Sequence, residues 1–280
     1  MISLFKRGMN WMTGAFTAIL TLVPEASFGH YHWAITDLME SFSCINCLLT
    51  NEELDTIIGK LLILLLVFSG CVILLFLISY FRESKTIKVG NSIIKVEYGD
   101  IMKVKDCLRV INFDECFTTK VGSEKGDIRP TSICGQYLLA NKNIDMQSLI
   151  RNAQVTPEKT KSQFKKKERF KSGVIVPNGK DLLMAFAKLD KEGRGMFPTI
   201  DDYRECLSTM WNEIDIHNQQ CDVCIPILGS GLARMDYTQQ ELLDMIIWSY
   251  KMTSRKLLQP YKLRIICKRN SGFSLDNIKQ

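Results

Sequence analysis

The sequence predicts a three-layer α/β/α domain with a mixed sheet, preceded by an α-helical transmembrane hairpin. Two observations carry this prediction. Residues 61–81 form a 21-residue stretch without a charge, and strand-like and helix-like segments alternate from residue 86 to residue 268. The mean hydropathy of 0.00 is the average of these two unlike parts. We therefore divide the chain into a membrane region, 1–84, and a second domain, 85–280.

The uncharged stretch lies in a candidate helix over residues 57–81. At 1.5 Å per residue the stretch covers about 30 Å, the thickness of the hydrocarbon core of a bilayer. Residues 50–53 have the spacing of a capping box, which would start the helix near Asn51. Residues 80–82 (Tyr-Phe-Arg) are typical of an interfacial anchor. A buried core helix is the alternative, but uncharged stretches of this length are rare in soluble cores.

A second candidate helix, 8–36, lies upstream. Its first part, from Gly8 to Pro24, has no charge, but three threonines dilute it and it is near the lower length limit for a membrane span. A first transmembrane helix that continues past Pro24 is the favoured interpretation. A cleaved signal peptide that begins with Lys6 and Arg7 and an interfacial amphipathic helix are the alternatives.

The charges that flank these helices predict their orientation. Basic residues precede the first segment at 6–7 and follow the second at 82–88, whereas the loop between them has acidic residues and no Lys or Arg before Lys60. The positive-inside rule therefore places both ends in the cytoplasm. We expect a multi-pass protein of the inner membrane with its domain 85–280 in the cytoplasm.

Most of the ten cysteines lie in the part predicted to be cytoplasmic, where thiols stay reduced. Those in apolar stretches are interpreted as small core residues: Cys107, Cys116, Cys206, Cys224 and Cys267.

Two Cys-x-x-Cys pairs have histidines nearby. Cys44 and Cys47 follow His30 and His32, but a local disulfide or two free thiols is favoured over a zinc site. The pair at 221–224, near His217, is disfavoured further because its second cysteine belongs to an apolar strand. We therefore predict no metal.

The net charge of +6 comes from residues 151–173, which hold eight Lys or Arg and two Glu. Charges elsewhere cancel, so a basic surface for nucleic acid is not predicted. The segment is polar and poor in aliphatic residues, which predicts a mobile basic insertion. A solvated insertion is favoured over a tether to anionic lipid headgroups.

The signals for strands and helices follow one another along the second domain. They first predict a hairpin, 86–89 and 93–98 with its turn at 90–91, and then buried strands at 107–112 and 174–177. The segment 180–188 is predicted as either a strand or a short helix. The rest of the chain is predicted as a helix from 200 to about 214 capped by Thr199, a strand at 221–228, a helix to about 253 that a capping box at Thr238 opens, and a last strand at 263–268. This alternation predicts a mixed sheet with helices on both faces.

The junction between the strand 221–228 and the next helix is the most informative local motif. Its loop, 229–234, reads Gly-Ser-Gly-Leu-Ala-Arg. Glycines without a Cβ let the backbone approach a bulky anion, and successive N–H groups would face that anion. Ligands of open α/β sheets bind at the carboxyl ends of strands, where this loop lies. It matches neither a Walker loop nor a Rossmann fingerprint, and a plain tight turn is the alternative.

Two polar residues follow other predicted strands. Asp100, in Gly-Asp-Ile, is suited to accept a hydrogen bond from an adenine amino group, and Asn112 is suited to reach a ribose hydroxyl. A turn aspartate and a capping asparagine are the alternatives.

These motifs, in this order, resemble a macro domain, the module that binds ADP-ribose. The likeness is carried by VEYGDIMK at 96–103, SICGQYLL at 132–139, DYRECLSTMW at 202–211 and IPILGSGLAR at 225–234. Together with the two membrane segments, they make the chain similar to the ThsA effector family of type II Thoeris antiphage systems. The domain 85–280 is thus expected to be macro-domain-like.

This resemblance implies a function that spacing alone does not show. A partner TIR enzyme would convert NAD into an ADP-ribose-derived messenger, histidine–ADP-ribose in type II systems, and the macro domain would bind it. The membrane segments of a homo-oligomer would then disrupt the bilayer and abort the infection. A membrane-bound ADP-ribosyl hydrolase and a ligand-free structural membrane protein are the alternatives.

The resemblance also implies roles for particular residues. Asp100 and Ile101 would hold the adenine, Asn112 and Asp114 would lie near the distal ribose, and Gly135 would belong to the first phosphate-side loop. The diphosphate would be wrapped by Gly229, Ser230, Gly231 and Leu232, with support from Arg234. Asn112 is followed by Phe-Asp-Glu, so the paired asparagines and glycine run of many macro-domain hydrolases are absent. We therefore expect a binder with no catalytic residues and no cofactor.

Overall fold

The computed structural model describes residues 51–89, 92–231, 236–254, 261–269 and 273–278 of the chain. The chain divides into two compact units, Met1–Arg82 and Glu83–Gln280. Several predictions lie outside the described residues: the helix 8–36, the cysteines at 44 and 47 with the histidines at 30 and 32, and the turn at 90–91.

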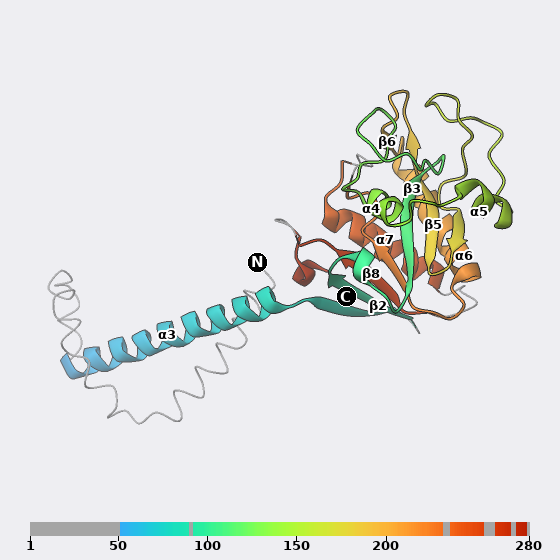
Figure 1. Ribbon diagram of the computed structural model, residues 1–280. Helices are drawn as coiled ribbons and strands as arrows, with labels where there is room; N and C mark the ends of the chain where they lie inside the picture. The colour runs from blue at the N-terminus through green and yellow to red at the C-terminus, as the bar shows by residue number, and fades with distance from the viewer. Residues whose placement is uncertain (1–50, 90–91, 232–235, 255–260, 270–272, 279–280) are drawn as a thin grey trace. The chain divides into compact units, whose positions relative to one another are not determined.

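The first unit contains helix α3, Asn51–Phe81 (Figure 1). Asn51 is also the first residue that the structure describes, so the predicted capping box at residues 50–53 stays a prediction. The stretch Gly59–Ile78 of this helix, 20 residues, is long and apolar enough to cross a membrane. Within the described part of the chain this is the one helix of that kind. The predicted transmembrane hairpin is therefore represented by its second helix alone.

The second unit is built on an eight-stranded mixed sheet with the strand order β1-β2-β8-β7-β3-β5-β4, in which β6 pairs with β5. The strands are β1 (Ser84–Val89), β2 (Ser92–Tyr98), β3 (Leu108–Asp114), β4 (Ile175–Asn178), β5 (Asp181–Leu189), β6 (Gly195–Met196), β7 (Val223–Pro226) and β8 (Leu263–Cys267). The pairs from β2 through β8, β7 and β3 to β5 are parallel, and the pairs β1–β2 and β4–β5 are antiparallel. The carboxyl ends of five neighbouring strands therefore lie along one edge.

Helices cover both faces of this sheet, as predicted (Figure 1). The helices are α4 (Ile133–Ala140), α5 (Met146–Asn152), α6 (Ile200–His217) and α7 (Gln239–Thr253). The central strand β5 shows why: its residues 182, 184 and 186 join the core cluster with α6 and α7, whereas 183 and 185 join the cluster with α4 and α5. A strand that is apolar on both faces must be covered on both, which gives three layers.

The capping signals locate the two long helices correctly. Thr199 caps α6 and Thr238 caps α7, and in each case the carboxylate three residues later accepts a hydrogen bond from the backbone N–H of the capping threonine. The undecided segment 180–188 is the strand β5. The helices α4 and α5 were not predicted, because each has only two turns and too few residues for a periodic pattern.

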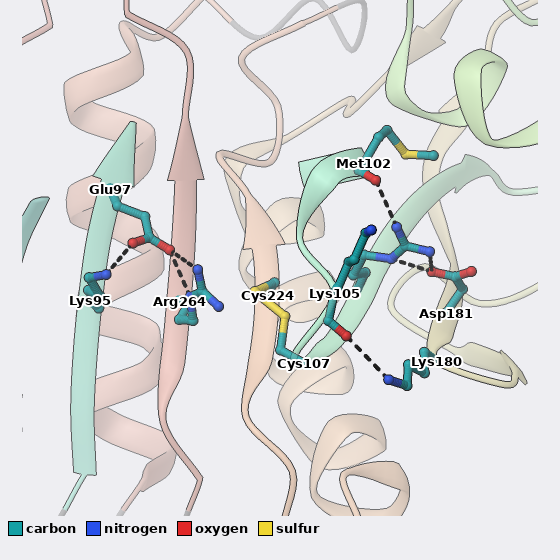
Figure 2. The surroundings of a disulfide bond; sticks show 10 residues. Lys95, Glu97, Met102, Lys105, Cys107, Lys180, Asp181, Cys224 and Arg264 are labelled. Atoms are coloured by element: carbon teal, nitrogen blue, oxygen red, sulfur yellow. Dashed lines mark hydrogen bonds and ion pairs between the residues drawn. A yellow bond between two sulfur atoms is a disulfide. The ribbon is translucent and has the colours of Figure 1, made fainter. Parts of the chain in front are cut away.

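One prediction about cysteines is wrong. Cys107 and Cys224, interpreted as reduced core residues, form a disulfide between the chain just before β3 and the strand β7 (Figure 2). Their Cα atoms lie 6.2 Å apart because β3 and β7 are parallel neighbours. The prediction of reduced thiols rested on the expected cytoplasmic compartment, whereas the disulfide depends on the pairing of β3 with β7. The disulfide also removes Cys224 from the disfavoured zinc site with Cys221.

The basic segment 151–173 leaves α5 and has no regular secondary structure beyond it. It is nevertheless attached to the domain, because Ser162, Phe164 and Phe170 are at most 5% exposed. Arg169 also forms an ion pair with Glu158 at 2.7 Å. The expectation of a mobile solvated loop missed these anchors, because the polar composition of the segment conceals two buried aromatic rings.

Candidate functional site

A cavity of about 860 Å³ lies at the edge where the parallel strands end. Its volume is in the range of small-molecule sites. The ends of β3, β7 and β8 and the residues that follow them contribute residues 112–114, 226–227, 229–231 and 266–268. Two further segments of the chain complete the wall, with residues 123–129, 131–134 and 192–195. The predicted site residues among those that line it are Asn112, Asp114, Gly229, Ser230 and Gly231.

The end of β3 brings an amide and a carboxylate to this cavity. The Oδ1 atom of Asn112 is buried and has no hydrogen-bond partner within the described structure. Asp114 is 7% exposed, and its Oδ1 atom accepts hydrogen bonds from the backbone N–H groups of Cys116 at 2.9 Å and Thr118 at 3.0 Å. Burial raises the pKa of the Asp114 carboxyl above its ordinary value, although these backbone hydrogen bonds oppose the shift.

The glycine loop after β7 is a tight, supported turn. Gly229 is buried with φ of +86°, a left-handed conformation that favours glycine. The Ser230 hydroxyl donates to the Ile227 carbonyl at 2.7 Å, and the buried Tyr203 hydroxyl of α6 donates to the Leu228 carbonyl at 3.0 Å. The loop is thus held from within and from the neighbouring helix. Two predicted residues of this loop, Leu232 and Arg234, lie outside the described residues.

The first residue of α7, Gln239, also lines the cavity. The N-terminus of this 15-residue helix therefore faces the same space as the glycine loop. Backbone N–H groups at a helix N-terminus carry a partial positive charge that favours anions.

Gly135 does not line the cavity, although its neighbours Ser132 to Cys134 do. It lies in the first turn of α4, where its N–H donates to the hydroxyl of the N-cap Ser132 at 3.0 Å. A Cβ on Gly135 would meet the carbonyl oxygen of Arg129 and lie 2.9 Å from the Cα of Pro130. The structure thus gives this glycine a packing reason: it lets α4 approach the loop that forms one wall.

Asp100 lines a second, smaller cavity of about 430 Å³ together with Ile266, whereas Ile101 lines neither cavity. The Asp100 carboxylate is exposed and caps the short 3-10 helix η3, Ile101–Lys103, by accepting from the Met102 N–H at 3.0 Å. Ile101 is 3% exposed and packs near the Cys107 disulfide. The two cavities adjoin, because Ile266 borders both.

The segment that carries Asp100 is fixed from the β3 side. The Arg109 guanidinium donates to the Met102 carbonyl at 3.0 Å and to the Asp181 carboxylate at 2.8 Å. Lys180 donates to the carbonyl of Lys105 at 3.3 Å. These contacts join the predicted adenine side of the site to the amino-terminal starts of β3 and β5, at the opposite edge of the sheet from the large cavity.

Sequence reasoning missed the loops 123–131 and 192–195, which form the wall beyond β3. Lys125 and Arg129 come from the first loop, and Lys268 follows β8. In the described structure none of these three cations has an acidic partner, whereas the acids of the same rim are paired: Glu124 and Asp127 with Lys120, and Glu192 with Arg194. The density of Gly, Ser and charged residues at 118–131 is a loop signal, but it does not indicate what the loop lines.

No group of three or more potential ligands for a metal ion occurs among the described side chains. Two buried free thiols line the cavity, Cys134 and Cys267. Burial raises the pKa of the Cys134 thiol well above its ordinary value, and the nearby Asp114 carboxyl adds to the shift. Burial also raises the pKa of the Cys267 thiol, to about 12.

Comparisons with known proteins agree with this architecture. The family model of the macro domain of Thoeris protein ThsA matches residues 94–268, from β2 to the end of β8. The chain is similar to Thoeris protein ThsA of Bacillus amyloliquefaciens (strain Y2), with 26% identity over 254 residues that cover 85% of this chain and 84% of the relative.

Solved structures of an Oceanobacillus iheyensis macrodomain are also similar. A mutant with ADPR aligns with a TM-score of 0.45 and 11% identity over 67% of this chain and 91% of that one. The same macrodomain with ADP aligns with a TM-score of 0.43 and 10% identity over 67% and 89%. From the family match over residues 94–268, the chain belongs to the Thoeris ThsA family and carries its macro domain.

Proposed function

We propose that this Thoeris component is a membrane-anchored antiphage effector whose macro domain is a receptor for an ADP-ribose-derived messenger, histidine–ADP-ribose in particular. The observation that carries the proposal is the electrostatics of the large cavity. Three cations without acidic partners, the N-terminus of α7 and the glycine loop at 229–231 converge on one space. A diphosphate is the kind of group that such a set of donors and positive charges binds.

The shape of the site supports an extended ligand. The small cavity beside Asp100 and the large cavity meet at Ile266. A dinucleotide-like molecule would place its base at the first and its diphosphate and distal ribose in the second. The unpartnered oxygen of Asn112 and the carboxylate of Asp114, at the far side of the glycine loop, suit hydroxyl donors of that ribose.

We propose a receptor and not a hydrolase. Two buried thiols line the described cavity, those of Cys134 and Cys267, and the raised pKa of each keeps it protonated and a poor nucleophile. The Oδ1 atom of Asp114 already accepts two backbone hydrogen bonds, which hold the carboxylate in a fixed position for a ribose hydroxyl. These features support binding without turnover.

The membrane part of the proposal rests on α3 and on the charge pattern of the sequence. The apolar stretch Gly59–Ile78 would anchor the chain in the inner membrane, with the macro domain in the cytoplasm and the helix 8–36 as a further pass. Ligand made by a TIR-domain enzyme would then reorganise a homo-oligomer and disrupt the bilayer.

Calorimetric titration of the full-length chain in detergent tests the receptor proposal. Wild-type protein is expected to bind histidine–ADP-ribose more tightly than ADP-ribose. Gly229→Val places a side chain at a left-handed position in the cavity wall and should weaken binding at least tenfold. Gly179→Val is the matched control, because Gly179 is also left-handed, with φ of +61°, but lies in the β4–β5 turn away from the cavity.

Three outcomes would contradict the proposal. Absence of binding to both nucleotides would refute the receptor, and equal loss in both glycine variants would assign the effect to stability. Release of a product from either nucleotide would favour the hydrolase. If binding is found, leakage of dye from vesicles that contain the chain, with and without nucleotide, tests the membrane step.

A further inference from the structure

The basic segment after α5 reaches the rim of the large cavity through one aromatic ring. Phe164 is 5% exposed. Its ring lies against Gly126 and Gly193, which belong to the two loops that line the cavity beyond β3. A Cβ on Gly126 would overlap the ring, and a Cβ on Gly193 would lie 2.9 Å from the ring and 2.7 Å from the Cα of Gly126. The two loops therefore meet at this ring with no room for a side chain.

The same segment is fastened to the end of β3 by a buried carboxylate. Glu115, 2% exposed, follows the cavity residue Asp114. Its Oε1 atom accepts from the Ser162 hydroxyl at 2.5 Å and from the Leu189 N–H at 3.1 Å, and its carbonyl accepts from the Phe170 N–H at 2.7 Å. Phe164 thus projects from a segment whose base is fixed to the strand that ends in the cavity.

Two lysines also lie close to the ring. The ammonium groups of Lys165 and Lys167 lie 5.0 Å and 5.7 Å from its centroid, within the range of cation–π interactions. The ring therefore contacts both the glycine backbone of the two loops and the cations of its own segment. A large side chain that replaced a glycine here, or a smaller one that replaced the ring, would change the distance between the two loops.

We propose that Phe164 is a positioning residue that sets the width of the ligand cavity at its end beyond β3. Strand order places this end on the opposite side of the glycine loop from Asp100, so it faces the group carried by the terminal ribose. The basic segment is then a structural part of the ligand site and determines specificity for that group. This inference rests on the proposed function for its ligand and on the described packing for its mechanism.

The test uses the full-length chain and two matched variants. Phe164→Leu shortens the ring that separates the loops. Phe170→Leu is the control, because Phe170 lies in the same segment with the same 5% exposure but packs on Phe117, with ring centroids 5.4 Å apart, and not on the loop glycines.

Amide hydrogen exchange of the ligand-free protein tests positioning without any nucleotide. Phe164→Leu should speed exchange at least about tenfold in both loops, 123–128 and 190–195, while Phe170→Leu leaves them unchanged. Unchanged exchange in Phe164→Leu would overturn the positioning role, whether or not the chain binds a nucleotide.

Titration tests specificity. Phe164→Leu should weaken the binding of histidine–ADP-ribose about tenfold and the binding of ADP-ribose less than about threefold. Phe170→Leu should preserve the wild-type ratio of the two affinities. Equal weakening of both ligands, or of neither, would overturn the specificity role while the receptor proposal stands. Wild-type protein that binds neither ligand would refute the proposed function, and with it the specificity role, but the exchange result would still decide the positioning role.

Discussion

The two glycines at 135 and 231 should differ in their response to the same substitution, although family resemblance assigned both to the ligand site: alanine should destabilise the protein at 135 and be tolerated at 231. Gly135→Ala would drive a methyl group into the backbone of residues 129–130, whose main-chain atoms cannot rotate away. Gly231→Ala would meet no atom within 4 Å and needs no left-handed backbone.

The magnitudes favour a clear difference. Overpacking of a fixed site costs about 1–3 kcal/mol, and the higher helix propensity of alanine returns up to about 1 kcal/mol in α4. A net loss of about 2 kcal/mol lowers the melting temperature of a unit of this size by about 4–8 °C. Gly231→Ala, on an exposed loop, should stay within about 0.5 kcal/mol of wild type.

Thermal unfolding followed by the near-ultraviolet circular dichroism signal of the buried Trp211 reports on the macro domain. Because the methyl group also displaces the cavity wall at Arg129, Gly135→Ala should weaken nucleotide binding as well. A Gly135→Ala protein as stable as wild type would refute the packing argument. A Gly231→Ala protein that loses several degrees would show that the loop is tighter than its surroundings indicate.

Three further predictions concern the frame of the site. Burial alone would raise the pKa of Glu97, but hydrogen bonds from its two basic partners outweigh burial and lower the pKa below 4.5. The ionised Glu97 therefore stabilises the fold above about pH 4.5, and this stabilisation is lost as the pH falls through the lowered pKa. In Glu97→Gln, the free energy of unfolding in urea should fall less steeply between pH 6 and pH 3 than in the wild type. The same pH dependence in both proteins would contradict this role of Glu97. Reduction of Cys107–Cys224, which are 117 residues apart, should lower the free energy of unfolding by about 2–4 kcal/mol, measured with and without dithiothreitol. Tyr203→Phe should cost about 1 kcal/mol in thermal unfolding, because the Leu228 carbonyl loses its buried donor; a stabilised variant would contradict this.

The elements that the sequence predicted well are those with a local physical signal. The capping boxes at Thr199 and Thr238 bond only to residues three positions away, so their sequence spacing is sufficient to locate both helices. The hairpin 84–98 and the apolar strands are likewise local patterns. The short helix α4 lacks such a pattern, and its glycine at 135 was assigned to a ligand loop although a helix packs there.

What the sequence could not predict depends on contacts between distant segments. The disulfide of Cys107 requires the pairing of β3 with β7, and the anchoring of the basic segment requires Glu115 to meet Ser162. Neither contact has a local sequence signal. The charged residues of the loop 123–131 that line the cavity were missed for the same reason. The sequence of a polar loop does not indicate which strand ends the loop will face.

One strand pairing, that of β2 with β8, brings the two cavities of the candidate site together. β2 and β8 are parallel, with Tyr98 opposite Cys267, and the N–H of Gly99 donates to the Cys267 carbonyl at 3.0 Å. The backbone that leads to Asp100 is therefore fixed beside the backbone that leads to Lys268, although 168 positions separate these two residues. Asp100 lines the small cavity and Lys268 the large one, so this pairing makes the two cavities neighbours. A ligand that joins a base to a diphosphate requires that adjacency, and the sheet provides it before any ligand binds.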